Sequence, residues 1–506
     1  MGAKFTRRQF LTAVSASATY LALANTVGCD LLGRTSKVRS MHTSRASPLR
    51  RPKVWPLSRG SSAPPNVFRS RPDLSPPAVE VTTQAPGTAP GYIFIAPKYG
   101  LGQNGPMILD NLGQPVWFRK GKYAMDFKVQ HYQGKPVLTW WEGEPFPRPS
   151  VGEYVILDRS YREITRVQAG NGHQGNQHEF LITPQDTALL TVYNPVRWDL
   201  SPLGGPKESV VMGGIAQELD IETGEVLFEW HSLYHVGPEE SYYGPHYRNY
   251  LDYFHINSID VDHDENLLIS ARNTSAVYKV DRKSSEVIWR LGGKNSDFEI
   301  GPGTPFAFQH DARRQRDGTL TIFDNGAAPK EHDQSRGIVL RLDEEEMTAT
   351  LVREYTSPDK LLAISQANMQ VLPNDNVFIG WGSEPFISEF SYDGKLLFNA
   401  HFPPDCESYR AFRFPWKGYP TDAPAVVAES GSDAEVTLYV SWNGATEVAT
   451  WEVLAGPHPG QLESVESFSR DGFETAMSVQ TSHPHVAVQA KDRSGQVLGA
   501  SEPVKL

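Results

Sequence analysis

The chain has 506 residues, 39% of them hydrophobic, so it is long enough for more than one domain with a buried core. Its two cysteines, Cys29 and Cys406, exclude a disulfide framework and a cysteine-based zinc site. Residues 1–72 hold 13 of the 48 basic residues and one of the 59 acidic residues, which leaves 35 basic and 58 acidic residues, a net charge of −23, for the remainder. A body this acidic is not typical of a nucleic-acid-binding protein.

Residues 1–29 are predicted to be an export signal. A twin-arginine motif, TRRQFL at 6–11, precedes an apolar run that is too short and too rich in Ser, Thr and Ala for a comfortable membrane span. TVGC at 26–29 resembles a bacterial lipobox, with Thr26 where Leu is usual, so Cys29 is a candidate lipidation site. The sequence thus predicts twin-arginine export to the periplasm or the cell exterior, with membrane attachment only through that lipid.

Residues 30–90 are rich in Arg, Ser and Pro and show little apolar periodicity. They are therefore predicted to form a disordered basic tether. Their positive charge would also suit contact with anionic lipid, although a solvated spacer is the simpler interpretation.

The stretch 252–281 reads as three short strands, and a fourth follows in EVIWRL at 286–291. INSIDVD at 256–262 alternates apolar and polar residues, as a half-buried strand does. Four antiparallel strands joined by tight turns are typical of one β-propeller blade. His255 begins the first strand and Arg272 follows the second, so both are expected at the same end of the sheet. A histidine and an arginine placed together in this way can act on an oxyanion.

A unit of strand, Asp turn and closing strand with an aromatic end recurs six times from about residue 91, at intervals of 48 to 62 residues. That period predicts an all-β fold with a six-bladed β-propeller at 91–417. Trp117, Trp230 and Trp289 close three of the units and are predicted to pack between blades. The aspartates of the six turns are Asp110, Asp158, Asp220, Asp281, Asp343 and Asp393.

An earlier strand of each unit runs into a turn of its own. Counting back seven to nine residues from three of these turns reaches His178, His255 and His310, in successive units. The innermost strands of a propeller line its central channel, so the three histidines are expected at one level of that channel. A lone histidine would more often be packing, whereas three at matching depth indicate a site.

The repeat ends near residue 417. Residues 418–506 alternate in the manner of a small β-sandwich and resemble a fibronectin type III or immunoglobulin-like module. Trp442 and Trp451 are predicted to belong to its core. No candidate site residue falls in this region, so the sandwich is predicted to be dispensable for chemistry.

Six ordered phrases within about residues 90–450 carry a family resemblance: QHEFLITP at His178, YFHINSID at His255, LLISARNTS at Arg272, FQHDAR at His310, IFDNGA at Asn325 and GWGSEPFISEF at Trp381. They resemble the bacterial and fungal arylsulfotransferase family. The resemblance implies a six-bladed propeller that moves a sulfuryl group from an aryl sulfate donor to a phenolic acceptor through a sulfated histidine. It implies no cofactor, no metal and no nucleotide sulfate donor.

The resemblance also implies the site residues: the nucleophile His310, the supporting histidines His178 and His255, the sulfate-binding Arg272, and Asn257 as a polar, substrate-binding residue of the same pocket. Trp381 lies near a blade end and is a candidate for lining an aromatic substrate pocket, although aromatic residues at blade ends are more often packing. The chemistry is consistent on its own terms. A neutral imidazole can attack the sulfur of an aryl sulfate and split one hard transfer into two. A guanidinium offers planar, permanently charged donors to the sulfuryl oxygens. Either supporting histidine could protonate the departing phenolate.

Two alternatives stay open at this point. DIETGEVLFEW at 220–230 resembles the tryptophan-docking repeats of quinoprotein dehydrogenases, although that signal mostly reports blade packing. A non-catalytic surface propeller with an immunoglobulin-like adhesion arm would explain the tether and the sandwich. It would not explain three histidines in register with an arginine.

Overall fold

The computed structural model describes residues 63–145, 150–245 and 249–506. The predicted signal at 1–29, with Cys29, and most of the predicted tether lie outside the described residues. The described chain is all-β, and its helices are short 3-10 turns: η1 (Ser201–Leu203), η2 (Ser232–Tyr234) and η3 (Pro238–Glu240). Within the three described ranges, no helix is long and apolar enough to cross a membrane.

Residues 80–414 form six mostly antiparallel sheets of four or five main strands. The first sheet contains β27 (Glu407–Phe414), β2 (Tyr92–Lys98), β3 (Met107–Leu109) and β4 (Pro115–Phe118). The second sheet contains β5 (Tyr123–Tyr132), β6 (Lys135–Glu144), β7 (Val151–Leu157) and β8 (Glu163–Val167). The third sheet contains β9 (Gly175–Ile182), β10 (Thr187–Trp198), β11 (Ser209–Asp220) and β12 (Val226–His231), with β13 (Tyr250–Leu251) beside β11.

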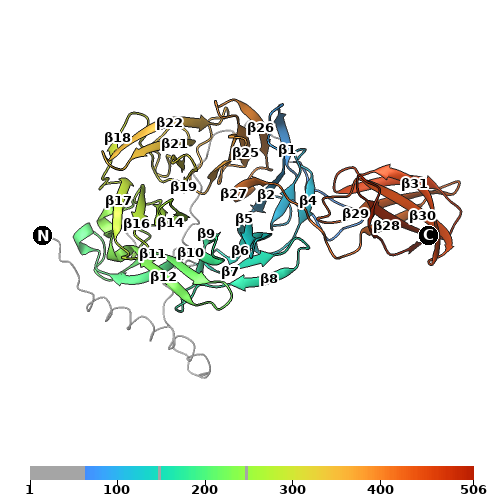
Figure 1. Ribbon diagram of the computed structural model, residues 1–506, viewed down its shortest axis with the longest axis horizontal. Coiled ribbons are helices and arrows are strands. Elements are labelled where there is room, and N and C mark those ends of the chain that lie inside the picture. The colour runs from blue at the N-terminus through green and yellow to red at the C-terminus, as the bar shows by residue number, and fades with distance from the viewer. Residues whose placement is uncertain (1–62, 146–149, 246–248) are drawn as a thin grey trace, which may run out of the picture.

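The other three sheets continue the same order. The fourth sheet contains β14 (Ile256–Val261), β15 (Leu267–Ala271), β16 (Ala276–Val280) and β17 (Val287–Gly292). The fifth sheet contains β19 (His310–Arg314), β20 (Leu320–Asp324), β21 (Arg336–Asp343) and β22 (Thr348–Thr356), with β18 (Glu299–Ile300) beside β22. The sixth sheet contains β23 (Asn368–Val371), β24 (Val377–Gly380), β25 (Phe386–Phe390) and β26 (Leu396–His401), with β1 (Glu80–Gln84) beside β26. Figure 1 shows the six sheets around a common centre, with β5, β9, β14, β19 and β27 nearest to it.

The sheet β14–β17 matches the four strands expected from the sequence. Ile256 pairs with Ala271 across β14 and β15, and the backbone N–H of Arg272 donates to the carbonyl of His255 at 3.0 Å. The prediction that His255 and Arg272 share one end of the sheet is therefore confirmed.

The predicted Asp turns join the third and fourth strands of the sheets. In the turn between β16 and β17, Oδ1 of Asp281 accepts the backbone N–H groups of Lys283 at 2.9 Å and Ser284 at 2.6 Å. The aspartates at 110, 158, 220 and 343 accept backbone N–H groups two to four residues on in the same way. Asp recurs at this position because its carboxylate accepts the backbone N–H groups that have no strand partner in the turn. Asp393 differs, because its carboxylate accepts the hydroxyl of Ser391.

Aromatic side chains fill the spaces between sheets, as predicted. Trp230 of β12 is buried against Phe254, which precedes β14, with ring centroids 5.8 Å apart. Trp117 of β4 stacks on Tyr161, which precedes β8, at 5.0 Å. Burial of a large apolar side chain contributes roughly 1.5–3 kcal/mol, so these contacts hold neighbouring sheets together.

The segment 63–90 departs from the predicted tether. β1 pairs with β26, and Phe68 packs on Phe473 at 4.3 Å between ring centroids. The Ser70 hydroxyl lies 2.7 Å from that of Ser441. The prediction of disorder is wrong for this segment because a few apolar side chains, spaced among prolines without periodicity, are enough to bind a chain to a surface that is already folded.

Residues 425–505 form two further sheets that enclose one apolar core. Trp451 lies in that core, as predicted, with 1% of its surface exposed. Trp442 is only half-buried, and its indole N–H donates to the carbonyl of Asp422 at 2.6 Å. The strands are β28 (Ala425–Ser430), β29 (Glu435–Ser441) and β32 (Glu474–Gln480); and β31 (Gln461–Ser469), β30 (Thr450–His458), β33 (His485–Lys491), β34 (Val497–Ala500) and β35 (Val504–Lys505).

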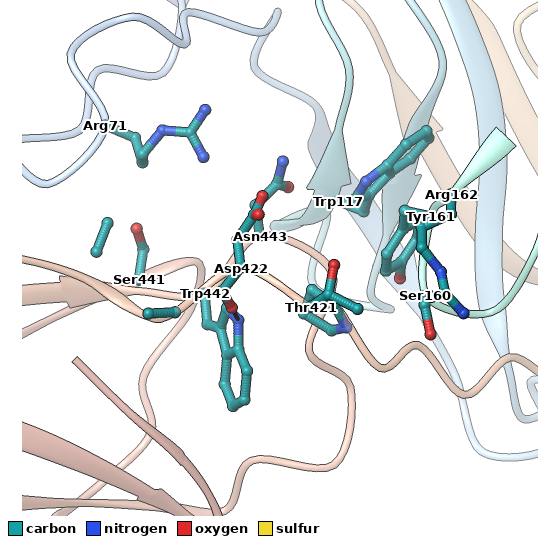
Figure 2. Close-up of a pocket in the computed structure, with 13 residues that line it drawn as sticks. Arg71, Trp117, Ser160, Tyr161, Arg162, Thr421, Asp422, Ser441, Trp442 and Asn443 are labelled. Carbon is teal, nitrogen blue, oxygen red and sulfur yellow. Dashed lines mark hydrogen bonds between the residues drawn. The ribbon is translucent and has the colours of Figure 1, made fainter. Parts of the chain in front are cut away.

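A pocket of about 360 Å³ lies where this C-terminal region meets β4 and the turn before β8. Figure 2 shows the stacked Trp117 and Tyr161 on one side and Trp442 on the other. The Tyr161 hydroxyl donates to the Gly444 carbonyl at 2.7 Å, and the side-chain amide of Asn443 bonds both backbone groups of Phe118. None of the predicted site histidines lines this pocket.

Candidate active site

The three predicted histidines stand on innermost strands of successive sheets. His178 lies within β9, His255 immediately precedes β14, and His310 begins β19. The strand ladder slips by one residue next to His255 and next to His310, as in a β-bulge. His255 has a φ of 56° and Asp311 a φ of 57°, left-handed conformations that non-glycine residues rarely adopt. Such local strain re-aims side chains and is concentrated at functional sites.

The structure brings the three rings together, as the register predicted. The ring centroids of His178 and His255 are 4.9 Å apart, and those of His255 and His310 are 6.4 Å apart, each pair meeting edge to face. Arg272 adjoins them through its backbone bond to His255. We call His178, His255, His310 and Arg272 the histidine layer.

His310 is 1% exposed, and its surroundings fix its tautomer. The Asn325 side-chain N–H group donates to the carbonyls of Ala363 and Gln366 at 2.9 and 3.1 Å, so its Oδ1 accepts from Nδ1–H of His310 at 2.8 Å. The Nε2 atom then carries the lone pair, and the backbone N–H of Gln366 points to it at 3.3 Å. Burial, followed by the charges of Arg272 and His255, holds the pKa of His310 well below its usual range. The contacts and the lowered pKa both favour a neutral His310 whose Nε2 carries the lone pair.

Arg272 is a buried cation, with 6% of its surface exposed. Its guanidinium donates to Oδ1 of Asn273 and the carbonyl of Ile364 at 2.9 Å, and to the carbonyl of Ala327 at 3.3 Å. It also lies 5.1 Å from the centroid of the Phe308 ring. Among the described residues it forms no ion pair, and its Nε has no hydrogen-bond partner. A buried charge without a counter-charge is costly, so an anion beside Arg272 would be stabilised strongly.

Comparison with protein families identifies residues 128–403 with the family described as arylsulfotransferase (ASST). The chain belongs to this family. The match spans more than half of the chain and contains the whole histidine layer. Arylsulfotransferase membership implies an aryl sulfate donor and a phenolic acceptor. A search of curated proteins finds no match.

The solved structures found to be similar to this chain are distant. A protein of unknown function from Bacteroides caccae shares 13% identity, with a TM-score of 0.39, and covers 64% of this chain and 98% of its own. A catalytically inactive virginiamycin B lyase from Staphylococcus aureus shares 9% identity, with a TM-score of 0.35, and covers 72% of this chain and 97% of its own. Likeness at this level carries no argument about the site.

The structure places Asn257 and Trp381 in supporting positions. The Asn257 side chain donates to the Gln309 carbonyl at 2.9 Å and accepts the Asp311 N–H at 3.3 Å. These two hydrogen bonds fix the backbone on both sides of His310. Trp381 is fully buried in the core, and its indole N–H donates to the Ser388 hydroxyl at 2.9 Å. Their substrate-binding roles stay predictions.

Sequence reasoning missed the residues that hold the ring nitrogens. Nδ1 of His255 lies 2.6 Å from Oδ2 of Asp252, and Nδ1 of His178 bonds Oδ1 of Asn176. Asn325 was part of a recognised phrase but carried no predicted role. A polar residue two or three positions before each of the first two histidines was the available signal.

A buried ionic layer adjoins the histidine layer and was also missed. Arg410 is fully buried and pairs with Asp126 at 2.8 Å, Glu179 at 3.2 Å and Asp311 at 3.4 Å. Burial alone would raise the pKa of Glu179, but the surrounding cations hold that pKa well below its usual range. The ionic layer comprises Asp126, Lys128, Glu179, Asp311, Arg313 and Arg410. In the part of the chain that the structure describes, no group of three or more His, Cys, Asp or Glu is arranged to hold a metal ion.

Proposed function

We propose that this arylsulfotransferase moves a sulfuryl group from an aryl sulfate to a phenol through Nε2 of His310, without a nucleotide donor. One observation carries the proposal: a buried arginine that forms no ion pair among the described residues adjoins a histidine whose pKa is held well below its usual range and whose lone pair is on Nε2. An aryl sulfate supplies the missing negative charge, and its sulfur is the electrophile that such an imidazole attacks.

In the first step the His310 Nε2–sulfur bond forms while the bond from sulfur to the aryl oxygen breaks. The electron pair of the broken bond leaves with the phenolate, which takes a proton from a neighbouring histidine. Arg272 neutralises charge on the sulfuryl oxygens as the transition state develops. In the second step a phenol gives its proton back, its oxygen attacks sulfur, and the bond between sulfur and Nε2 breaks. Phenols with pKa near 10 are reversible leaving groups, which suits exchange between them.

The test is an assay with a chromogenic aryl sulfate and phenol as acceptor, with no nucleotide present. We expect release of the chromogenic phenol together with formation of phenyl sulfate, and neither product with the His310→Ala variant. A strict requirement for a nucleotide sulfate donor would contradict the proposal.

We further propose that the six sheets are the blades of one propeller at 91–417, in which β27 completes the first blade, and that 418–506 is an immunoglobulin or fibronectin III-like sandwich. The pairing of β27 with β2 supports this, because it joins the two ends of the repeat within one sheet. An experimental structure with a different number of blades would contradict it.

We also propose that the protein is exported through the twin-arginine pathway and is lipidated at Cys29. The motifs at 6–11 and 26–29 support this proposal. A variant with Arg7→Lys and Arg8→Lys should be retained in the cytoplasm on fractionation. Its normal export would contradict the twin-arginine assignment.

A further inference from the structure

Two consecutive tyrosines, Tyr242 and Tyr243, lie beside the histidine layer in the loop that follows η3. This loop is attached to the residue after Arg272. The backbone N–H of Tyr242 donates to the Asn273 carbonyl at 2.8 Å, and the Ser241 hydroxyl donates to the same carbonyl at 3.4 Å. The loop is therefore held at the end of the sheet β14–β17 at which Arg272 lies.

The guanidinium of Arg272 lies over two aromatic rings. Its Cζ atom is 5.6 Å from the ring centroid of Tyr243 and 5.1 Å from that of Phe308, and its Nη1 group approaches the Tyr243 hydroxyl at 3.4 Å. The rings of Tyr243 and Phe308 meet edge to face at 5.8 Å, and those of Tyr242 and Phe308 do so at 6.4 Å. Three connected aromatic side chains thus border the arginine, and we call them the aromatic cluster.

The aromatic cluster extends from the interior of the protein to its surface. Phe308 is 1% exposed and Arg272 is 6% exposed, Tyr243 is half-buried, and Tyr242 is 46% exposed. A molecule that reaches Arg272 along this cluster therefore passes Tyr242 first and Tyr243 next.

Lys294 supports the exposed tyrosine. Its ammonium group lies 5.2 Å from the centroid of the Tyr242 ring and donates to the carbonyls of Glu239 and Ser241 at 2.9 and 2.6 Å. The cation–π contact and the two hydrogen bonds to the loop restrict the position of the ring. An exposed ring that is ordered in advance loses little conformational entropy when a ligand packs on it.

An aryl sulfate carries an anion and an aromatic group that are joined directly. With the sulfate beside Arg272, the ring attached to it is in reach of Tyr243, and only a larger aryl group continues to Tyr242. We propose that Tyr242 is a specificity-determining residue that makes the protein prefer donors with extended, fused-ring aryl groups over donors with a single ring. The inference rests on the proposed function and deepens it, because it names the class of donor.

The experiment compares kcat/KM for phenyl sulfate and 2-naphthyl sulfate, with 4-methylphenol as acceptor and no nucleotide present. Both leaving groups are phenols without an activating substituent, so the donors differ mainly in aromatic area. We expect the wild type to prefer 2-naphthyl sulfate. Tyr242→Ala should lower the ratio of the two kcat/KM values by ~3–10-fold, the scale of one aromatic contact. Tyr242→Phe keeps the ring and should restore the ratio.

Tyr419→Ala is the matched control. Tyr419 is 45% exposed and has the guanidinium Cζ of Arg159 4.9 Å from its ring centroid, but it lies where the C-terminal region meets the turn before β8. Its replacement should not change the ratio. An equal ratio in wild type and Tyr242→Ala, or an equal fall in Tyr419→Ala, would overturn the inference and leave the proposed function intact.

A binding measurement separates failure of the inference from failure of the proposed function. A wild type that turns over neither donor without a nucleotide would overturn the proposed function. Binding of 2-naphthyl sulfate, followed by its fluorescence, does not require turnover, and Tyr242→Ala should weaken this binding by ~3–10-fold. Unchanged binding in Tyr242→Ala would overturn the inference.

Discussion

The histidine layer and the ionic layer adjoin one another on the same strands, yet they treat buried charge in opposite ways. Glu179 follows His178 and Asp311 follows His310, so a shift of one residue separates a reactive ring from a structural carboxylate. In the ionic layer three cations meet three carboxylates. In the histidine layer the hydrogen-bond partners of Arg272 among the described residues are uncharged: two backbone carbonyls, the Asn273 side-chain amide and the Tyr243 hydroxyl. The buried charges of the ionic layer compensate one another, whereas the buried positive charge of Arg272 has no ion-pair partner among the described residues, which is what the proposed binding of a sulfate anion requires.

The largest effect on activity is expected from His310→Ala. Loss of the nucleophile should lower aryl sulfate turnover by ~10⁴-fold or more, because the covalent route disappears. Thermal unfolding should show that the variant still folds. Activity within tenfold of wild type would place the nucleophile elsewhere in the layer.

The largest effect on stability is expected from Arg410→Met in the ionic layer. Removal of one member leaves carboxylates buried without compensation, which costs about 3–5 kcal/mol in the free energy of unfolding. Denaturant unfolding measures this loss, and Arg341→Met, at an exposed position of β21, is the matched control. If the two variants are equally stable, the ionic layer is not structural and the comparison between the layers fails.

Arg272→Lys tests the difference between the two layers, because its main expected effect is on catalysis. Lysine keeps the positive charge but loses the planar donors, so turnover should fall by ~10²–10³, the scale for loss of an oxyanion donor. The expected signature is a lower kcat in a variant that still folds, even where the lost hydrogen bonds to Asn273, Ala327 and Ile364 lower its melting temperature. A rise in KM alone would mean that Arg272 binds ground state and transition state equally.

The depressed pKa of His310 predicts a pH effect on stability. Below the unfolded pKa of about 6.5 the unfolded chain binds a proton at this position and the native protein does not, so stability is lost as pH falls. Between pH 7 and 5 the wild type should lose up to about 1.4 kcal/mol more per pH unit than His310→Gln. His131→Gln, at an exposed position, should follow the wild type. Parallel curves for wild type and His310→Gln would contradict a neutral, buried His310.

The smallest effect is expected from the C-terminal region. Trp442 lines the junction pocket and lies outside both layers (Figure 2). Trp442→Ala should therefore change aryl sulfate turnover by less than about 2-fold, even where it lowers the melting temperature through lost packing. A turnover loss comparable to that of Arg272→Lys would mean that the junction communicates with the site.

Much of this arrangement was predictable because it is periodic. Alternation at 256–262 and the repeated Asp turns predicted strands and their order, and counting back from turns brought His178, His255 and His310 to one level. Side-chain pairing between sheets has no period. Arg410 joins strands that are hundreds of residues apart in sequence, so no local pattern could predict its bonds to Asp126 or Glu179.

Other features depend on surfaces that exist only after folding. The strand β1 forms because β26 offers a free edge, so the composition of 63–90 alone indicated disorder. The tautomer of His310 depends on where the loop 363–366 lies, since two of its carbonyls orient Asn325. A motif could mark the histidine, but only the three-dimensional contacts show which of its nitrogens carries the lone pair.

The central claim is that Nε2 of His310 carries the sulfuryl group between donor and acceptor. Mass spectrometry of protein quenched after mixing with an aryl sulfate, in the absence of an acceptor, tests it most directly. We predict a gain of one sulfuryl group on the peptide that contains His310, which disappears when phenol is added before quenching. A sulfuryl group on His178 or His255, or phenol release with an unmodified His310 peptide, would contradict the account.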